Sequence, residues 1–313
     1  MRVRLNTTYA SSSVGSGTYT RNMLLALPGA QEFRLPAALT RPRPIPFWTK
    51  RLVEELFSIA PGTTIHPYWA ASCSSGDVVS ALDLVQYREA TVVERQMLRR
   101  SVRSARAVLA LSAAAALEVE AELGRRCVVA HPFPDAAWYR PSLGLREKPS
   151  RQIRLAYWGG WHKRKGISAF LEALSRSRIA PDVEVVLVGR APQVLGLQVE
   201  RHPVVAVNAL VAIAESCDLS VYPSQEEGFG LPVFESLLRG VPVITRSLPV
   251  YDEFVAASPA HIRLESNEPA EVAQAVEDAI AGDVPPVASL LKWTTRDQAL
   301  ALIKDSLRKA LST

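Results

Sequence analysis

Short apolar runs rich in β-branched residues alternate with segments of helical periodicity along most of the 313-residue chain. A strand followed by a helix and another strand is typical of parallel sheets covered by helices on both faces. We therefore expect an α/β fold. The expected strands cover residues 2–6, 63–66, 77–82, 107–111, 127–130, 153–157, 183–188, 219–222 and 242–245. The expected helices cover residues 18–27, 90–104, 113–123, 167–178, 232–239, 270–281 and 295–311.

The length of the chain is about twice that of a typical domain, which favours two domains. Residues 141–152 contain two prolines, one glycine and charges of both signs, as a linker between two sheets would. We expect a first domain over 1–145, a second over 151–294 and a terminal helix over 295–313.

Composition excludes several classes of protein. With 48% hydrophobic and 21% charged residues the chain is not disordered, and the sequence lacks the long apolar run of a membrane span. The first residues do not have the pattern of a signal peptide. Three cysteines far apart in the sequence argue against both a disulfide framework and a cysteine metal site. We expect a cytoplasmic protein.

The positive charge is concentrated in the first half of the chain. Residues 1–150 hold 19 Lys and Arg against 12 Asp and Glu, a net +7, whereas the remainder holds 17 against 19. The first domain could therefore face an anionic molecule, such as a lipid phosphate at the inner membrane face. The alternative, that these arginines only keep the surface soluble, stays open. Neither zinc-finger spacing nor an RNP-like segment is present, so no nucleic acid partner is expected.

The segment 222–235 follows a strand and opens a helix, which is where ligands bind in α/β sheets. Gly228 and Gly230 let the backbone approach a ligand closely, and the amides at the helix start attract phosphate. With Pro232 as the first helical residue, Glu235 falls in the first turn, where its carboxylate can accept ribose hydroxyls. Glu227 lies where a transferred group would be. Alternatively, Glu235 only neutralises its own helix start.

Three other segments follow expected strands. In residues 157–166, the cations Arg164 and Lys165 stand close to Gly160 and could hold a pyrophosphate, or form a solvated basic turn. Gly15 and Gly17 follow the first strand but lack the third glycine of a dinucleotide fingerprint, and a flexible turn is the alternative. His66 at a strand end could donate a hydrogen bond to a sugar, or be structural.

Glu227 and Glu235, with seven residues between them, resemble the E-x7-E signature of retaining, nucleotide-sugar-dependent glycosyltransferases of family GT4. The resemblance implies the GT-B fold, with two Rossmann-like parallel-sheet domains facing across a cleft. The first domain would bind the acceptor and the second the donor, and the terminal helix would cross back to the first domain. The first glutamate would contact the donor sugar and the second the ribose, with Gly228, Phe229, Gly230 and Leu231 between them at the nucleotide.

The resemblance extends to the other segments. Lys165 matches the family's phosphate-binding lysine, but Gly159 or Gly160 stands where its arginine is expected, so Lys163 or Arg164 would substitute. Gly15 and Gly17 match the glycine-rich loop over the donor phosphates.

The family often carries histidines at two successive strand ends of the first domain. His66 matches the first of them. At the second, usually His-Asp-Leu, this chain has Leu82, Asp83 and Leu84. His66 and Asp83 therefore join Glu227 as candidate catalytic residues. Ser112 matches a serine at the next strand.

The reaction expected from the resemblance transfers a sugar from a UDP-, GDP- or dTDP-sugar to a hydroxyl of a glycan, glycolipid or natural-product intermediate. The sequence has no Asp-X-Asp triplet and no cluster with metal-ligand spacing, so no metal or other cofactor is expected. We favour a front-face displacement in which Glu227 positions the sugar. Two alternatives stay open: an epimerase of the same fold that acts on the nucleotide sugar, and an inactive nucleotide-binding module.

Overall fold

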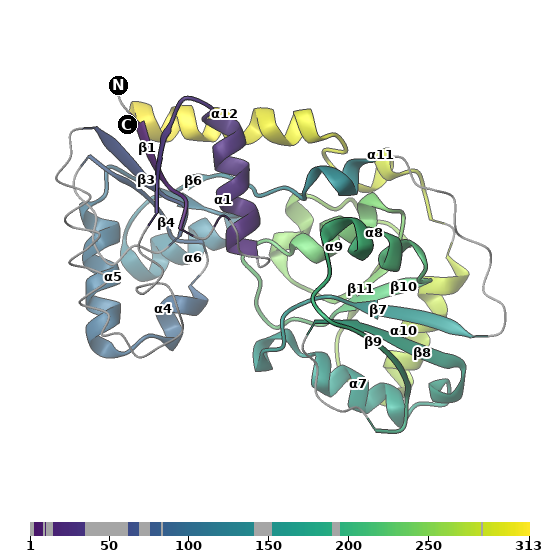
Figure 1. Ribbon diagram of the computed structural model, residues 1–313. Coiled ribbons are helices and arrows are strands. Elements are labelled where there is room, and N and C mark those ends of the chain that lie inside the picture. The colour runs from purple at the N-terminus through teal and green to yellow at the C-terminus, as the bar shows by residue number, and fades with distance from the viewer. Residues whose placement is uncertain are drawn as a thin grey trace. The chain divides into compact units, whose positions relative to one another are not determined.

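The computed structural model describes residues 3–8, 10, 15–34, 62–68, 76–82, 84–140, 152–189, 195–282 and 284–313. These residues form two parallel sheets of six strands each, with helices packed against them (Figure 1). The α/β fold expected from the alternating pattern is therefore confirmed. The expected linker, apart from Gln152, lies outside the described residues.

The chain divides into two compact units. The first unit comprises Met1–Phe133 and Asp297–Thr313, and the second comprises Pro134–Arg296. The division falls earlier than the expected end of the first domain at residue 145. The physical reason is that the 3-10 helix η1 (Ala136–Tyr139) is held by the second unit.

Arg239 provides that anchor. Its guanidinium donates to the backbone oxygen of Trp138 at 3.3 Å and to that of Arg140, and it pairs with the carboxylate of Glu215. Both charged side chains of the pair are buried, so each charge is compensated by the other and the guanidinium also by these carbonyl groups.

The first unit contains a sheet of strand order β2-β1-β3-β4-β5-β6. Its strands are β1 (Val3–Asn6), β2 (Gln31–Phe33), β3 (Thr63–His66), β4 (Val78–Ser80), β5 (Ala107–Ala110) and β6 (Val128–Val129). Its helices are α1 (Gly15–Ala26), α4 (Val85–Glu89), α5 (Val92–Ser104), α6 (Ala113–Leu123) and α12 (Arg296–Ser312). The last helix joins this unit through Ser306, whose hydroxyl donates to the backbone oxygen of Val129 at 2.6 Å.

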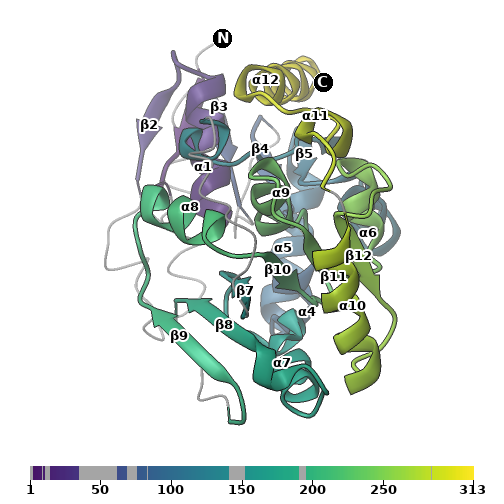
Figure 2. The ribbon, with the colours of Figure 1, turned by 90° about the vertical axis from the view of Figure 1, so that its right-hand side faces the viewer.

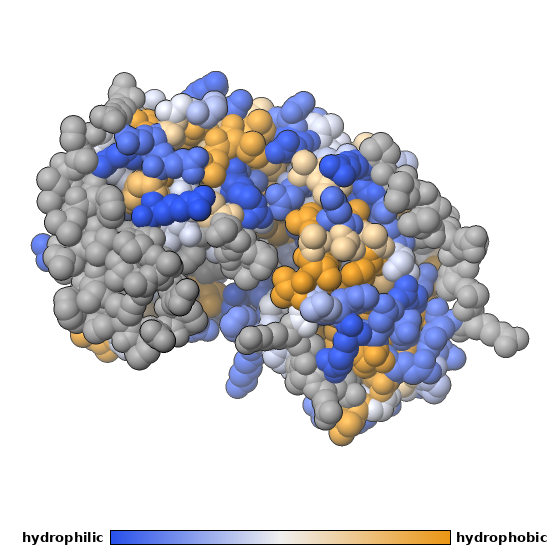
Figure 3. All heavy atoms as spheres, in the orientation of Figure 1, coloured by the Kyte–Doolittle hydropathy of each residue, from blue (hydrophilic) through white to orange (hydrophobic). Residues whose placement is uncertain are grey.

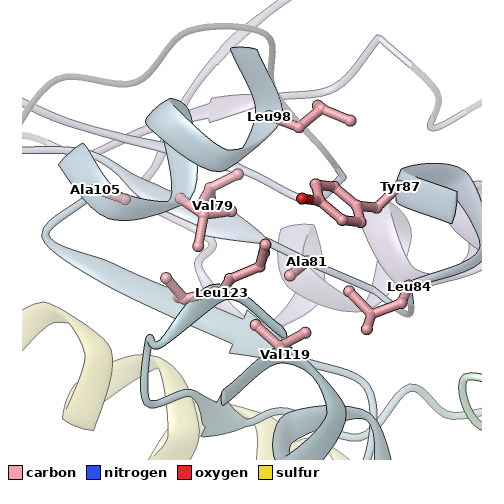
Figure 4. Packing of buried hydrophobic residues seen from close by; sticks show 10 residues of the cluster. Val79, Ala81, Leu84, Tyr87, Leu98, Ala105, Val119 and Leu123 are labelled. Atoms are coloured by element: carbon pink, nitrogen blue, oxygen red, sulfur yellow. The ribbon is translucent and has the colours of Figure 1, made fainter. Parts of the chain in front are cut away.

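Helices cover both faces of this sheet. Figure 4 shows Val79 of β4 packed among apolar side chains from α5 and α6. The next residue, Ser80, points to the opposite face, since it neighbours the buried Tyr19 of α1. The α5 helix starts at a capping box in which Thr91 and Glu94 each bond the other's backbone amide.

The second unit contains a sheet of strand order β12-β11-β10-β7-β8-β9. Its strands are β7 (Ile153–Tyr157), β8 (Val183–Val188), β9 (Gln198–His202), β10 (Leu219–Tyr222), β11 (Val243–Arg246) and β12 (His261–Leu264). Its α-helices are α7 (Ile167–Ser175), α8 (Val207–Glu215), α9 (Leu231–Leu238), α10 (Pro269–Ala281) and α11 (Val287–Leu290). Three further 3-10 helices are η2 (Lys163–Lys165), η3 (Ala180–Asp182) and η4 (Pro249–Glu253).

The interior strands of this sheet are buried on both faces. Val185 and Val186 are adjacent in β8 and point to opposite faces, yet neither is exposed. Helices α7 and α10 pack together on one face, and α8 and α9 lie on the other with η1 (Figure 2). Apolar side chains gather over α8 on the face shown in Figure 3. No helix in the described part of the chain is long and apolar enough to cross a membrane.

Candidate active site

The topology of the second sheet singles out one edge. From β7, the chain proceeds to β8 and β9 on one side, and then returns to β10, β11 and β12 on the other. Ligands of open α/β sheets bind at the carboxyl ends of the strands where the order reverses. Here that point lies between β7 and β10, and the loops that follow these two strands are 158–166 and 223–230. Both are segments that the sequence analysis selected.

The two loops are bonded to each other. The amide of Gln225 donates to the backbone oxygen of Arg164 at 2.8 Å, and the Arg164 guanidinium donates to the backbone oxygen of Glu226 at 3.2 Å. Gly166 has φ +67°, and a Cβ there would overlap the backbone oxygen of Pro223. Only glycine suits both requirements. The loops therefore form one continuous surface.

A lysine and a glutamate from the two loops form an ion pair. Lys165 Nζ lies 2.7 Å from Glu227 Oε1, and the hydroxyl of Ser224 donates to the same oxygen at 2.7 Å. The exposed fractions of the Lys165 and Glu227 side chains are 15% and 11%. The structure thus brings together two residues that the sequence analysis selected separately, and adds Ser224, which it did not select.

Glu235 lies one residue further into α9 than expected. The helix begins at Leu231 after Gly230, whose φ is +90°, so Glu235 is its fifth residue and not part of the first turn. Pro232 is the second helical residue, not the first. A Cβ at Gly230 would lie 2.6 Å from Tyr251 Cε1, so this glycine cannot carry a side chain without displacing the tyrosine. The helix start predicted at Pro232 was wrong by one residue because Gly230 already turns the chain.

Glu235 is tied to the loop after β7. The indole Nε1 of Trp158 donates to Glu235 Oε2 at 2.9 Å. Burial raises the pKa of Glu235 to about 7; the hydrogen bond from Trp158 opposes this rise, and the charge of Asp135 adds to it. One carboxylate oxygen is therefore occupied by the indole, and the carboxyl group titrates near neutral pH.

Aromatic rings support Trp158. Its ring stacks on Trp138 with centroids 5.7 Å apart and meets Tyr222 edge-on at 5.5 Å. Tyr157 donates its hydroxyl to the backbone oxygen of Gly160 at 2.7 Å, and burial together with the charge of Glu227 raises its pKa. The sequence analysis missed Trp158 and Trp138. The only sequence signal was the position of Trp158 directly after a strand.

The side chain of Phe229 lies in the core of the second unit. Its side chain is 2% exposed and packs against Phe254 at 4.6 Å, and against Phe234 and Trp293. The ring anchors the loop to the core of the second unit, so Phe229 could contact a nucleotide only through its backbone. Gly228 and Gly230 precede α9 and Leu231 begins it, while the amides of Val233 and Phe234 donate to the backbone oxygen of Gly230 at 3.0 and 3.3 Å.

In the first unit, the strand order reverses between β1 and β3. Gly15 and Gly17 lie in the first turn of α1, which begins at Gly15 and not at the expected residue 18. His66 ends β3 and is 1% exposed, with its ring edge-on to Phe33 and Tyr68 at 6.5 and 6.4 Å. Its Nδ1 lies 3.4 Å from Asn6 Nδ2.

Leu82 and Ser112 are the next two residues that the sequence analysis compared with the family. Leu82 has φ +26°, a strained value for leucine, and packs against the core beside α5. Ser112 is buried and caps α6 by accepting a hydrogen bond from the amide of Ala115 at 3.0 Å. Asp83 lies outside the described residues. Within the described part of the chain, no three His, Cys, Asp or Glu side chains are grouped to hold a metal.

Residues 152–281 match the family described as glycosyl transferases group 1. The match covers most of the second unit. The serotype-specific mannosyltransferase WbdA of Escherichia coli is 34% identical over 90 residues, which are 28% of this chain and 11% of WbdA. The chain thus spans about a tenth of the length of the curated relatives it matches.

Solved structures resemble the fold of the whole chain. Sucrose-phosphate synthase from Thermosynechococcus elongatus has a TM-score of 0.71 at 16% identity, covering 100% of this chain and 94% of that one. HepE of Anabaena, in complex with UDP and glucose, also has a TM-score of 0.71 at 16% identity, covering 100% and 99%. The expected GT-B fold is confirmed.

Proposed function

We propose that this protein is a retaining glycosyltransferase of family GT4 that moves a sugar from a nucleoside-diphosphate sugar to an acceptor hydroxyl. One observation supports it above all. Lys165 and Glu227 come from two bonded loops at the point where the strand order of the second sheet reverses, and Glu235 of α9 is bonded to Trp158 in the first of these loops. That is where a nucleotide binds in sheets of this kind.

Each group has a task in donor binding. The ammonium of Lys165 and the positive dipole ends of α7 and α9 would neutralise the diphosphate. Arg164 rather than Lys163 would take the place of the missing arginine, because its guanidinium already lies in the joined loops. Glu235 would accept ribose hydroxyls on Oε1, since Trp158 occupies Oε2. HepE, of the same fold, has been solved with UDP and with UDP-glucose, which supports a nucleotide donor.

The chemistry follows from the placement of Glu227. In the free protein its carboxylate is held by Lys165 and Ser224, at 2.7 Å from each. A bound diphosphate would compete for the lysine, leaving Glu227 oriented by Ser224 to accept hydrogen bonds from the donor sugar. The bond between the anomeric carbon and the phosphate oxygen then breaks through an oxocarbenium-like state. The acceptor oxygen bonds to the same face, and its proton passes to the departing phosphate. We propose that no metal is needed.

The base and the acceptor are further parts of this proposal. Val204 is exposed in the segment between β9 and α8 and would suit contact with the face of a base. The net +7 over residues 1–150 supports an anionic acceptor, including a lipid phosphate reached by peripheral membrane contact. Mannose deserves testing as the sugar because WbdA is named a mannosyltransferase.

A thermal-shift panel of UDP, GDP, dTDP and their sugar conjugates tests donor binding. A ligand at 100 times its dissociation constant stabilises the folded state by about 2.7 kcal/mol, so the correct donor should raise the melting temperature clearly. Incubation of that donor with a panel of hydroxyl acceptors should then give a glycoside of retained configuration. A changed sugar without any acceptor would indicate an epimerase, and binding without transfer an inactive module. If no nucleotide binds, the proposal fails.

A further inference from the structure

His66 and Asn6 lie side by side at the carboxyl edge of the first sheet. Strands β1 and β3 are parallel neighbours in which Leu5 pairs with Ile65, so the two following residues end the strands together. Both side chains are buried, and Asn6 Nδ2 lies 3.4 Å from His66 Nδ1. What an imidazole can do depends on which ring nitrogen carries the proton, and its neighbour decides this.

The orientation of the Asn6 amide is fixed by Thr8. Asn6 Oδ1 accepts the backbone N–H of Thr8 at 3.2 Å and the Thr8 hydroxyl at 2.6 Å. A backbone N–H can only donate, so the atom facing it must be the amide oxygen. The NH₂ group of Asn6 must then face the histidine. Rotating the amide by 180° would place two donors against each other, which removes the usual ambiguity of asparagine assignment.

The histidine must accept this hydrogen bond. Nδ1 can do so only with a free lone pair, and in a neutral imidazole the single proton is then on Nε2. We propose that Asn6 is a positioning residue that holds His66 as the neutral Nε2–H tautomer, so that His66 supplies a hydrogen-bond donor and not a general base. Its part in sugar transfer rests on the function proposed above; the tautomer does not.

This assignment constrains the route of the acceptor's proton. With Nδ1 occupied by Asn6 and a proton on Nε2, the ring has no lone pair left to deprotonate an acceptor hydroxyl. The proton must go elsewhere, and the departing phosphate oxygen is the group that gains basicity as the glycosidic bond breaks. An Nε2–H can instead donate to a ligand oxygen at the carboxyl edge of the first sheet, where added negative charge on that oxygen strengthens the bond. Phe33 and Tyr68, both edge-on to the ring, limit its rotation.

Nitrogen NMR of the full chain with ¹⁵N-labelled histidine tests the tautomer directly. The chain has five histidines, and loss of one signal set in His66→Gln identifies the ring. The expected spectrum between pH 7 and 8 is that of neutral Nε2–H imidazole. Asn6→Asp replaces the donor by a carboxylate that only accepts, so Nδ1 should become protonated. Gln96→Glu, the same change of charge at an exposed position of α5, should leave the spectrum unchanged. An Nδ1–H or doubly protonated ring in the unaltered protein would overturn the proposal, even if Asn6→Asp failed to fold.

Kinetic measurements distinguish a His66 that donates a hydrogen bond from a His66 that acts as a general base. Glutamine can place an N–H near the position of Nε2, so His66→Gln should keep several-fold more turnover than His66→Ala; equal losses would contradict the donor role. Asn6→Asp should lower kcat roughly 10- to 100-fold, by analogy with the loss of one oriented donor, and leave the thermal shift by the nucleoside diphosphate unchanged. A normal kcat with an altered tautomer would also overturn the role in transfer. Failure of every nucleotide to bind would refute the proposed function but leave the NMR result decisive for the tautomer.

Discussion

The ammonium of Lys165 lies 2.7 Å from Oε1 of Glu227, and the two residues come from loops 62 residues apart in sequence. The cation that we propose to bind phosphate and the anion that we propose to contact the sugar therefore neutralise each other. Because a diphosphate would compete with Glu227 for the same ammonium, the two residues should respond differently to substitution.

Glu227→Gln should uncouple binding from turnover. The amide keeps the shape of the side chain but releases Lys165, so affinity for the nucleoside diphosphate should stay equal or rise a few-fold. Turnover should fall on the order of 100-fold, since the neutral amide is a weaker acceptor for the sugar hydroxyls. Calorimetry and initial rates measure both effects. Glu172→Gln, an exposed glutamate of α7, is the matched control. Near-normal turnover would remove Glu227 from the mechanism.

Lys165→Met should have the opposite effect on nucleoside-diphosphate affinity. The methionine fills similar volume without charge, so diphosphate affinity should fall roughly 10- to 100-fold, consistent with the loss of a charge-assisted contact of about 1.5–3 kcal/mol. The melting temperature should also fall, because Glu227 keeps only Ser224 as a hydrogen-bond partner among the contacts given above. Lys309→Met, at an exposed position of α12, should change neither. An unchanged dissociation constant would show that other groups hold the phosphates.

The sequence predicted the interior strands of both sheets but missed three strands, β2, β9 and β12. All three lie at sheet edges. An edge strand has a neighbour on one side only and tolerates polar residues, as in β9, whose sequence QVERH has charged side chains and two exposed positions. Apolar run length, the signal that found the interior strands, is therefore weak at sheet edges.

The candidate site was predictable in part. Glu227, Glu235 and Lys165 stand in short segments whose position after a strand can be read from sequence. Their partners cannot be found in that way: Trp158 is 77 residues from Glu235, and Asn6 is 60 residues from His66. Which donor meets which acceptor depends on strand order, and strand order follows from packing of the whole chain. Ser224, three residues from Glu227, was within reach of local reasoning but has no distinctive pattern.

Arg239→Met should destabilise the second unit strongly. The guanidinium and the Glu215 carboxylate are both buried, and removal of one partner leaves the other charge without compensation. Such a change lowers the free energy of unfolding by about 3–5 kcal/mol. Denaturant titration followed by tryptophan fluorescence should detect this loss of stability, because the backbone oxygen of Trp138 accepts a hydrogen bond from the same guanidinium. Arg176→Met, which breaks an exposed ion pair with Glu172 of α7, should have an effect below about 1 kcal/mol.

Trp158→Phe should weaken the hold on Glu235 while keeping an aromatic ring against Trp138. The indole hydrogen bond favours the charged carboxylate, so its loss should raise the pKa of Glu235 further. Nucleotide affinity should consequently fall several-fold at pH 7 and recover partly at pH 8.5. Trp161→Phe, which keeps the edge-on contact with Tyr157, is the control. Equal affinity at both pH values would show that Trp158 acts only through packing.

The pKa of Glu235, raised by burial to about 7, predicts opposite effects of pH on stability and on binding. Between pH 4.5 and 7 the folded protein keeps a proton that the unfolded chain has lost, so this group's contribution to the free energy of unfolding falls as pH rises and levels off above 7. In the function proposed above, ribose hydroxyls need the Glu235 carboxylate as acceptor, so nucleotide affinity should increase over the pH range in which stability decreases. Glu235→Gln cannot titrate; relative to it, the unaltered protein should lose melting temperature from pH 5 to 8 and gain nucleotide affinity. Parallel pH profiles for the two proteins would place the titrating group elsewhere.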